Sequence, residues 1–213
     1  MSKAYTLYGA PRGGSMIVEA AFAVADVEVA PVDLDWSEVG WDSAPLKALN
    51  PLGQVPTLVT PDGAVMTESA AMILHLNDLK PQAGLAPPAD HPRRPAFLRW
   101  LIFLVSAIYP TFTYGDEPAR WLAGDEAAGA KLRSGTDEHR QMLWRYLEGQ
   151  VDGPWLLGDT WSALDLYLPA MMYWRPGRAW FQAECPKLHA TSARMQSHPA
   201  YERVMQRHGL AKG

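Results

Sequence analysis

The chain has 213 residues, 48% of them hydrophobic and 20% charged, a balance typical of a folded protein with material for more than one core. Its net charge of −4 and scattered basic residues exclude the concentrated basic face of a nucleic-acid-binding protein. The one cysteine, Cys185, excludes an internal disulfide or a cysteine-based metal cluster, and the histidine spacing predicts no metal site. We expect Cys185 to be a small, partly buried apolar residue.

The first eighty residues alternate between strand-like and helix-like patterns. β-rich stretches end at glycine and proline turn residues, and small-residue stretches repeat apolar positions at helical spacing. The turn sequence Pro61-Asp62-Gly63 between two short β-rich runs predicts a hairpin. The expected elements are strands at 4–8, 27–34, 56–59 and 64–66 and helices at 15–25 and 68–79. Their order predicts an α/β class with a small sheet of parallel and antiparallel strands.

The composition changes after residue 80. Residues 80–95 contain five prolines and little periodicity, which predicts a linker. The rest of the chain has helical periodicity, and no strand is expected after Met66. We therefore expect an α/β domain at 1–80, a linker at 81–95 and an all-helical domain at 96–213.

Neither a signal peptide nor a membrane span is expected. The N-terminal residues lack the apolar run of a signal peptide. The most apolar segment, 100–109, is about half of the ~20 residues that span a bilayer. The chain is therefore expected to be soluble and cytoplasmic, with no membrane and no nucleic acid among its partners.

The most informative segment is Asn50-Pro51-Leu52-Gly53-Gln54-Val55-Pro56. Proline at the opening of a strand removes a donor from the sheet. A cis Val55–Pro56 bond would account for it, because X–Pro bonds tolerate the cis form. This geometry would turn the N–H and C=O of Val55 outward, where an extended peptide can pair with them. A trans proline in an edge strand is the alternative.

A second feature follows at Thr67-Glu68-Ser69. Thr67 is expected to cap the helix at 68–79, and the free N–H groups at that helix start favour a carboxylate ligand. Ser69 could add a hydroxyl donor, and the Glu68 carboxylate could receive an ammonium group. Simple capping would also explain Thr and Glu at these positions.

Together these two features resemble the glutathione site of the cytosolic glutathione transferase superfamily. The resemblance implies that the main chain of Val55, next to Pro56, pairs with the cysteinyl unit of glutathione. It further implies that Glu68 and Ser69 hold the γ-glutamyl end, and that Gln54 also reaches the ligand. Glutathione would act as a co-substrate, without a metal.

The resemblance covers nearly the whole chain and implies a fold. Residues 158–165 match a helix-start signature of the family, in which Ser162 and Asp165 form a capping box, and residues 186–201 are similar to its last helices. The implied architecture is a thioredoxin-like α/β domain followed by an all-helical domain. The family also implies a homodimer.

The group that activates the thiol is open in the sequence. The reactive species is the thiolate, so the family lowers the thiol pKa with a Tyr, Ser or Cys after the first strand. Here the serine-type position falls on Gly13 and the tyrosine-type position on Tyr8. Ser15, at the start of the first helix, is the favoured donor, with Tyr8 or a main-chain N–H as alternatives. Arg12 is a further candidate for holding an anion. The alternative is that Arg12 is a solvated loop residue.

A second pocket is expected between the two domains, facing the sulfur. Pro110 should distort the helix that contains it and thereby expose neighbouring side chains. The substrate-pocket candidates are three aromatics around this proline, Tyr109, Phe112 and Tyr114, with Trp174 and Met171 as secondary candidates. Core packing is the alternative for each of them.

The resemblance implies a glutathione transferase that conjugates the thiolate to a small apolar electrophile, as in detoxification. Isomerase, dehalogenase or peroxidase chemistry could use the same site. A non-catalytic binding or interaction protein is a further alternative, favoured by Gly13 at the serine-type position.

Overall fold

The computed structural model describes residues 4–39 and 44–210, and their strands form one four-stranded sheet in the order β2-β1-β3-β4. The strands are β1 (Tyr5–Gly9), β2 (Val29–Asp33), β3 (Thr57–Val59) and β4 (Val65–Met66). The helices are α1 (Ser15–Val24), α2 (Ala44–Lys47), α3 (Ser69–Leu79), α4 (Arg94–Phe103), α5 (Tyr109–Asp116), α6 (Glu126–Glu148), α7 (Ala163–Met172), α8 (Arg178–Glu184), α9 (Pro186–Gln196) and α10 (Pro199–Arg207).

The sheet mixes parallel and antiparallel pairs, as expected. β1 pairs with β2 in parallel and with β3 antiparallel, and β3 pairs with β4 antiparallel. Pro31 lies in β2 at the edge of the sheet, where a missing backbone donor is tolerated. The hairpin predicted around residues 61–63 is confirmed, since the Thr60 N–H donates to Ala64 O at 2.9 Å.

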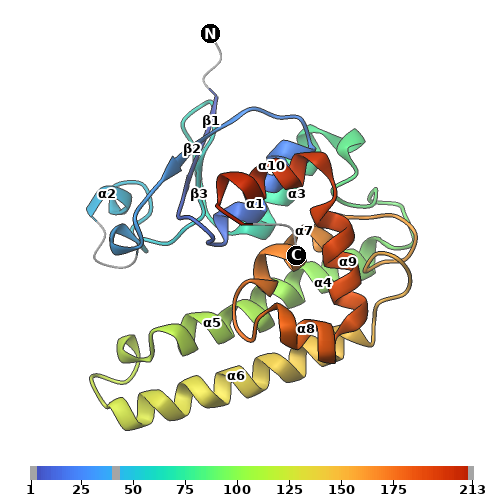
Figure 1. Cartoon of the computed structure of the whole chain (residues 1–213). Coiled ribbons are helices and arrows are strands. Elements are labelled where there is room, and N and C mark those ends of the chain that lie inside the picture. Colours follow the sequence, from blue (N-terminus) through green and yellow to red (C-terminus); the bar gives the residue numbers. More distant parts are fainter. Residues whose placement is uncertain (1–3, 40–43, 211–213) are drawn as a thin grey trace.

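The apolar helix α1 lies at the centre of the molecule (Figure 1). It contacts β1, α3, α7 and α10, and nearly all of its side chains are buried. A helix that is hydrophobic on all sides needs partners all round. One contiguous core therefore runs from Leu7 in the sheet to Met205 near the C-terminus.

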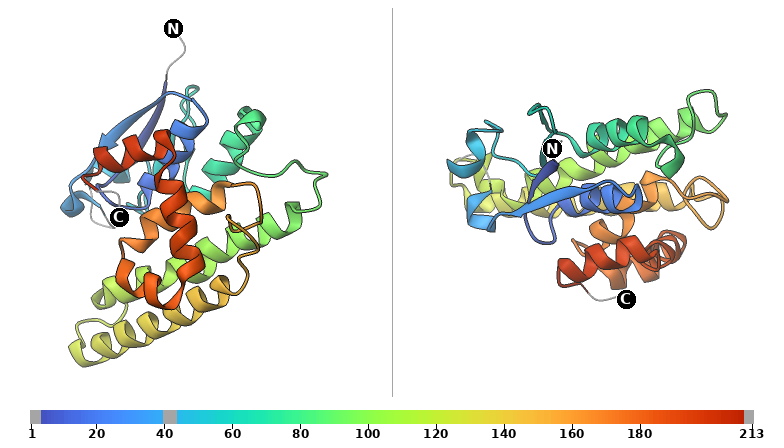
Figure 2. Two further views of the ribbon diagram at one scale, coloured as in Figure 1. Left: turned by 45° about the vertical axis from the view of Figure 1, so that its right-hand side comes forward. Right: turned by 90° about the horizontal axis from the view of Figure 1, so that it is seen from above.

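The C-terminal half is helical, as predicted. Among the described residues no strand follows β4, and Trp155 and Gly158 form only an isolated bridge. The long helix α6 packs along α5, and the left view of Figure 2 shows both helices extending away from the sheet. The expected α/β-plus-all-α fold class is confirmed by this arrangement.

Two sequence-based expectations differ from the structure. The predicted linker at 81–95 is partly packed: Leu85 is buried and its C=O accepts the Ala163 N–H at 2.7 Å. The helix after β4 begins at Ser69, with Glu68 rather than Thr67 as its N-cap and no side-chain cap. The division into domains at 80 and 96 stays a prediction.

The helical run Arg94–Asp116 extends well beyond the apolar segment at 100–109 in both directions. By length and composition alone this 23-residue run could cross a membrane, since an 18-residue stretch of it has a mean hydropathy of 1.4. The core helix of a globular protein can be equally long and apolar, and 39% of this 18-residue stretch is buried inside the structure. A π-helical turn, Leu104–Ile108, stands just before Pro110, so the distortion expected near this proline is present.

The capping box at the start of α7 is confirmed. The Asp165 carboxylate accepts from Ser162 N at 2.8 Å and from Leu156 N at 3.0 Å, and the Ser162 hydroxyl accepts from Leu164 N. Burial raises the pKa of Asp165 to about 6, although the N–H groups of Leu156 and Ser162 lower it. The carboxyl group is therefore mainly ionised at pH 7.5 and serves two backbone donors.

We expect Asp165→Asn to lower the free energy of unfolding at pH 7.5 by about 1–3 kcal/mol. An amide keeps one acceptor but turns an N–H₂ toward the second backbone N–H, which is then left buried and unpaired. Urea denaturation measures the loss. Asp159→Asn, at an exposed position in the preceding loop, is the matched control. Equal stability of both variants would contradict the structural role given to Asp165.

Candidate functional site

A cavity of about 590 Å³ lies between the sheet end of the molecule and the helical half. The first half of the chain lines it with Gln54, Val55, Pro56, Glu68 and Ser69, five of the six predicted ligand-binding residues. The helical half contributes the aromatic side chains of Tyr109, Phe112 and Trp174. The loop that contains Arg12, Gly13 and Gly14 completes this part of the lining. The fold thus brings together segments about 40 to 160 residues apart in the sequence.

The Val55 segment is shaped by its own short-range hydrogen bonds. The Asn50 side chain donates to Gln54 O at 3.0 Å and to Thr57 Oγ1 at 3.1 Å, and Thr57 Oγ1 donates to Gln54 O. The Val55–Pro56 bond is cis. Within the part of the chain that the structure describes, neither the N–H nor the C=O of Val55 is hydrogen-bonded. Both groups can therefore pair with an extended ligand.

The start of α3 is the polar end of the cavity. Glu68 has a φ of 67°, in the left-handed region that favours glycine, and its C=O accepts the Met72 N–H of the first helical turn. Such backbone strain in a non-glycine residue clusters at ligand sites. The hydroxyl groups of Ser69 and Tyr167 lie 3.0 Å apart, and burial raises the Tyr167 pKa, so its hydroxyl stays protonated. If Tyr167 donates to Ser69, the Ser69 proton is available to a ligand carboxylate.

The aromatic part of the lining is a packed cluster. Trp174 meets Tyr109 edge-on at 5.5 Å between centroids and Phe112 at 5.1 Å. The third predicted pocket residue, Tyr114, does not line the cavity: it is 43% exposed and packs against Trp121. Met171, a secondary candidate, is fully buried outside the lining. Tyr114 follows Phe112 by two residues, about half a turn of α5, so helical spacing directs it away from the cavity side.

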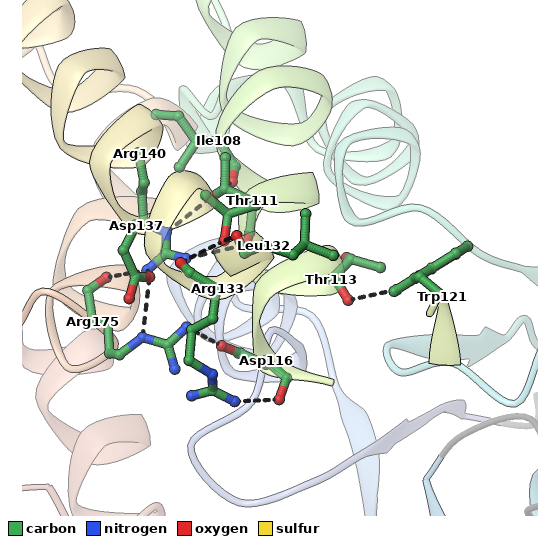
Figure 3. Close-up of polar contacts among 11 residues, drawn as sticks. Ile108, Thr111, Thr113, Asp116, Trp121, Leu132, Arg133, Asp137, Arg140 and Arg175 are labelled. Carbon is green, nitrogen blue, oxygen red and sulfur yellow. Dashed lines mark hydrogen bonds and ion pairs between the residues drawn. The ribbon is translucent and has the colours of Figure 1, made fainter. Parts of the chain in front are cut away.

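A buried arginine holds this part of α5 in place. Arg140 of α6 donates to Thr111 Oγ1 at 2.8 Å and to Thr111 O at 3.1 Å, and it pairs with Asp137 at 2.8 Å. Its guanidinium also lies 3.8 Å from the centroid of the Phe112 ring. Figure 3 shows this cluster, in which Arg175 links Asp137 to Asp116. None of these residues was predicted from the sequence, because an arginine in a polar helix is usually a surface residue.

The loop after β1 is held by residues from the far end of the chain. The Arg12 N–H donates to His208 Nδ1 at 3.0 Å, and its guanidinium donates to the carbonyls of His208 and Gly209. Trp174 Nε1 donates to Arg12 O at 2.9 Å. His208 Nε2 in turn lies 3.0 Å from the buried Glu19 carboxylate. Arg12 therefore lines the cavity with much of its donor capacity already engaged by the C-terminal segment.

The two predicted activating residues are not in the cavity lining. Ser15 is buried, and its hydroxyl exchanges hydrogen bonds with the main chain of Ala10 at 3.3 Å. Tyr8 lies within β1, paired with Val32 and Thr57. By contrast, the N–H groups of Gly14 and Ser15 at the start of α1 have no acceptor in the described residues. Of the three predicted donors, the main-chain groups are therefore the ones that the geometry favours.

We expect Ser15→Ala to lower the stability of the fold and to leave the activation of the thiol unchanged. Loss of the hydroxyl leaves the buried Ala10 N–H without an acceptor, which costs about 1–2 kcal/mol. Chemical denaturation measures this loss, and thiolate absorbance with bound glutathione measures the activation of the thiol. A variant with unchanged stability and no thiolate would restore Ser15 as the activating residue.

Comparisons with known proteins identify the family. Residues 25–79 match the sequence profile of the "Glutathione S-transferase, N-terminal domain" family. An uncharacterised GST-like protein of Escherichia coli, YncG, is 37% identical over 206 residues, covering 96% of this chain and 98% of that protein.

Solved structures give the same fold. A glutathione transferase from Methylococcus capsulatus has a TM-score of 0.78 at 28% identity, over 97% of this chain and 100% of that one. A glutathione transferase homologue from Sulfitobacter, solved with bound glutathione, has a TM-score of 0.85 at 23% identity, over 99% and 100%. The fold, the match over nearly the full length of a relative and the matched N-terminal profile together show that this chain belongs to the glutathione S-transferase family.

Proposed function

We propose that this protein is a glutathione transferase that conjugates glutathione to a small apolar electrophile. The observation that carries the proposal is the cavity itself, in which the six predicted glutathione contacts share one lining with Gly13 and Gly14, just before α1, and with an aromatic cluster. The bound glutathione of the Sulfitobacter homologue supports the identity of the ligand.

In the proposed complex, glutathione lies extended along the first half of the chain. The free N–H and C=O of Val55, beside Pro56, pair with its cysteinyl unit, and the Gln54 side chain adds a contact. The N-terminal end of α3 and the Ser69 hydroxyl hold the γ-glutamyl carboxylate, since helix starts favour anions. The Glu68 carboxylate receives the ammonium group of the same unit.

The reaction proceeds through the thiolate. The thiol proton is lost to solvent, and the sulfur electron pair then forms a carbon–sulfur bond while the leaving group departs with its bonding electrons. The N–H groups and the dipole at the start of α1 stabilise the negative sulfur. Tyr109, Phe112 and Trp174 hold the apolar electrophile next to it, so that proximity supplies part of the rate enhancement. Isomerisation, dehalogenation and peroxide reduction would begin with the same thiolate.

The test is a titration of the purified protein with glutathione at neutral pH, followed by thiolate absorbance in the ultraviolet. A saturable thiolate signal above that of the two components alone is the expected result. Binding without a thiolate signal would overturn the proposal, and a calorimetric titration records the binding separately.

A non-catalytic glutathione-binding protein is the second candidate. It is favoured by the first loop, where Gly13 stands at the serine-type position and the Ser15 hydroxyl is bonded to Ala10. Glutathione binding without a thiolate signal is the result that would select it.

We further propose that the protein is a homodimer. Leu98 and Ile102, one turn apart on α4, are 37% and 52% exposed. Neighbouring exposed apolar side chains mark an interaction surface. Light scattering coupled to size-exclusion chromatography should give twice the mass of the chain, and the mass of one chain would contradict the proposal.

A cytoplasmic location and a role in the detoxification of electrophiles complete the proposal. Both rest on the proposed reaction, because glutathione conjugation removes reactive apolar compounds. Cell fractionation tests the location, and the sensitivity of a deletion strain to electrophiles tests the role. Recovery of the protein with membranes, or unchanged sensitivity, would contradict the respective part.

A further inference from the structure

Two side chains from elsewhere in the fold occupy the space above the glycines of the first loop. A Cβ atom on Gly13 would lie 3.0 Å from the Trp36 ring, and one on Gly14 would lie 2.6 Å from the Tyr109 hydroxyl oxygen. Both distances are shorter than ordinary contacts between carbon and its neighbours. The absence of side chains at these glycines therefore makes room for Trp36 and Tyr109 at the start of α1.

The Tyr109 hydroxyl has no hydrogen-bond partner among the described residues, although it is buried. The ring is fixed edge-on against Trp174 and, at 6.5 Å, against Tyr167. An unpaired buried hydroxyl destabilises a fold, so each one in a native structure calls for an explanation. The position of Tyr109 in the cavity lining offers one, because a bound molecule could supply the missing acceptor.

Other charged and polar groups near the loop are already engaged. The Ser15 hydroxyl bonds to Ala10, the Arg12 guanidinium to the carbonyls of His208 and Gly209, and Tyr8 is absent from the lining. Tyr109 is therefore the one described hydroxyl that combines a place in the lining, contact with the helix start and an unused donor.

We propose that the Tyr109 hydroxyl donates a hydrogen bond to the glutathione thiolate at the start of α1, in place of a hydroxyl from the first loop. This inference rests on the proposed function. The thiol proton leaves to solvent, and Tyr109 keeps its own proton throughout, while the carbon–sulfur bond forms and the leaving group departs. Tyr109 would thus be a catalytic residue supplied by the helical half of the chain.

The protonation state of Tyr109 agrees with this role. Burial raises its pKa well above the ordinary value, with smaller contributions from Tyr167 and Tyr201. The phenol is therefore a hydrogen-bond donor at neutral pH and not a base. A donor to the charged form of a thiol lowers that thiol's pKa.

The test is Tyr109→Phe, which removes one oxygen and keeps the ring. The ultraviolet thiolate absorbance of bound glutathione is recorded against pH, and glutathione affinity is measured by calorimetry at a pH where the thiol is protonated. We expect the pKa of the bound thiol to rise by about one unit and the conjugation rate with an activated aryl chloride to fall about tenfold below that pKa. Affinity for the protonated form and thermal stability should not fall, since no existing hydrogen bond is lost. Tyr146→Phe, which removes an exposed hydroxyl bonded to Arg99, is the matched control.

A double-mutant cycle with Gly14→Ala tests the contact itself. The new methyl group would collide with the Tyr109 oxygen, whereas the nearest ring carbons lie 3.5 Å away. Gly14→Ala should therefore raise the thiol pKa in the protein with Tyr109 and change it little in the Tyr109→Phe background.

The outcomes separate this inference from the proposed function. If the wild-type protein gives a thiolate signal and Tyr109→Phe has the same thiol pKa, the role of Tyr109 is overturned. The transferase proposal then stays intact. An unchanged thiol pKa with a slower conjugation would also overturn it, because the hydroxyl would then act on the electrophile. Absence of a thiolate signal in the wild-type protein would remove both.

Discussion

Replacing Arg140 with methionine should lower the free energy of unfolding by about 2–4 kcal/mol. The Arg140 side chain is fully buried and donates to Thr111 twice and to Arg175 O. Methionine fills most of the volume but donates to none of these acceptors. Burial lowers the pKa of Arg140 and Asp137 opposes this shift, so the guanidinium depends on its partners for its stability as a buried cation.

Arg145→Met on the same helix is the control. Arg145 pairs with Glu184 at 3.0 Å, but both side chains are more than 40% exposed, and such surface pairs contribute about 0–1 kcal/mol. Arg140→Lys should recover only part of the loss, because an ammonium cannot reach acceptors in the directions of a guanidinium. Guanidinium chloride denaturation of the three variants decides the matter. Equal losses for Arg140→Met and Arg145→Met would contradict the role of the buried cluster.

The largest effect on ligand binding is expected for Glu68→Gln. Its carboxylate lies in the cavity lining at the start of α3, where we propose that it receives the ammonium group of glutathione. Weakening a charge-assisted hydrogen bond of this kind should raise the Kd for glutathione about 10- to 100-fold. Stability should change little, because the Glu68 side chain makes no cap hydrogen bond to α3.

Calorimetric titration with glutathione measures this change. Asp78→Asn removes the same unit of charge from an exposed position near the other end of α3 and should bind glutathione like the unmodified protein. Removing the amino group from the ligand provides a second check, since a des-amino analogue should bind both proteins alike. Unchanged affinity of Glu68→Gln for glutathione would contradict the proposed binding of the ammonium group at the start of α3.

Features that depend on neighbouring residues were predictable. The hairpin at 61–63 and the capping box of Ser162 and Asp165 follow from backbone preferences within a few residues, and both are confirmed. The cap of α3 was predicted one residue early, because Thr67 is a good capping residue by type. The observed cap at Glu68 has a positive φ, a conformation that its residue type does not suggest.

The candidate site likewise has residues that were predictable from local sequence and residues that were not. Val55, Pro56, Glu68 and Ser69 belong to two short motifs, and all four line one cavity. Tyr114 was predicted beside Phe112, but their two-residue separation directs them to different sides of α5. The aromatic residues around Pro110 therefore predicted which segment lies in the pocket wall, but not which of its side chains line the cavity.

By itself, the sequence determined the order of strands and helices, the change to an all-helical second half and the motif residues of the ligand site, since all of these reside in local patterns. Only the tertiary structure decided which groups reach the start of α1. Arg12 meets His208 across 196 residues, and Tyr109 meets Gly14 from another helix. Such contacts depend on how helices pack around a common core, and the space left by a missing Cβ becomes visible only when that packing is complete.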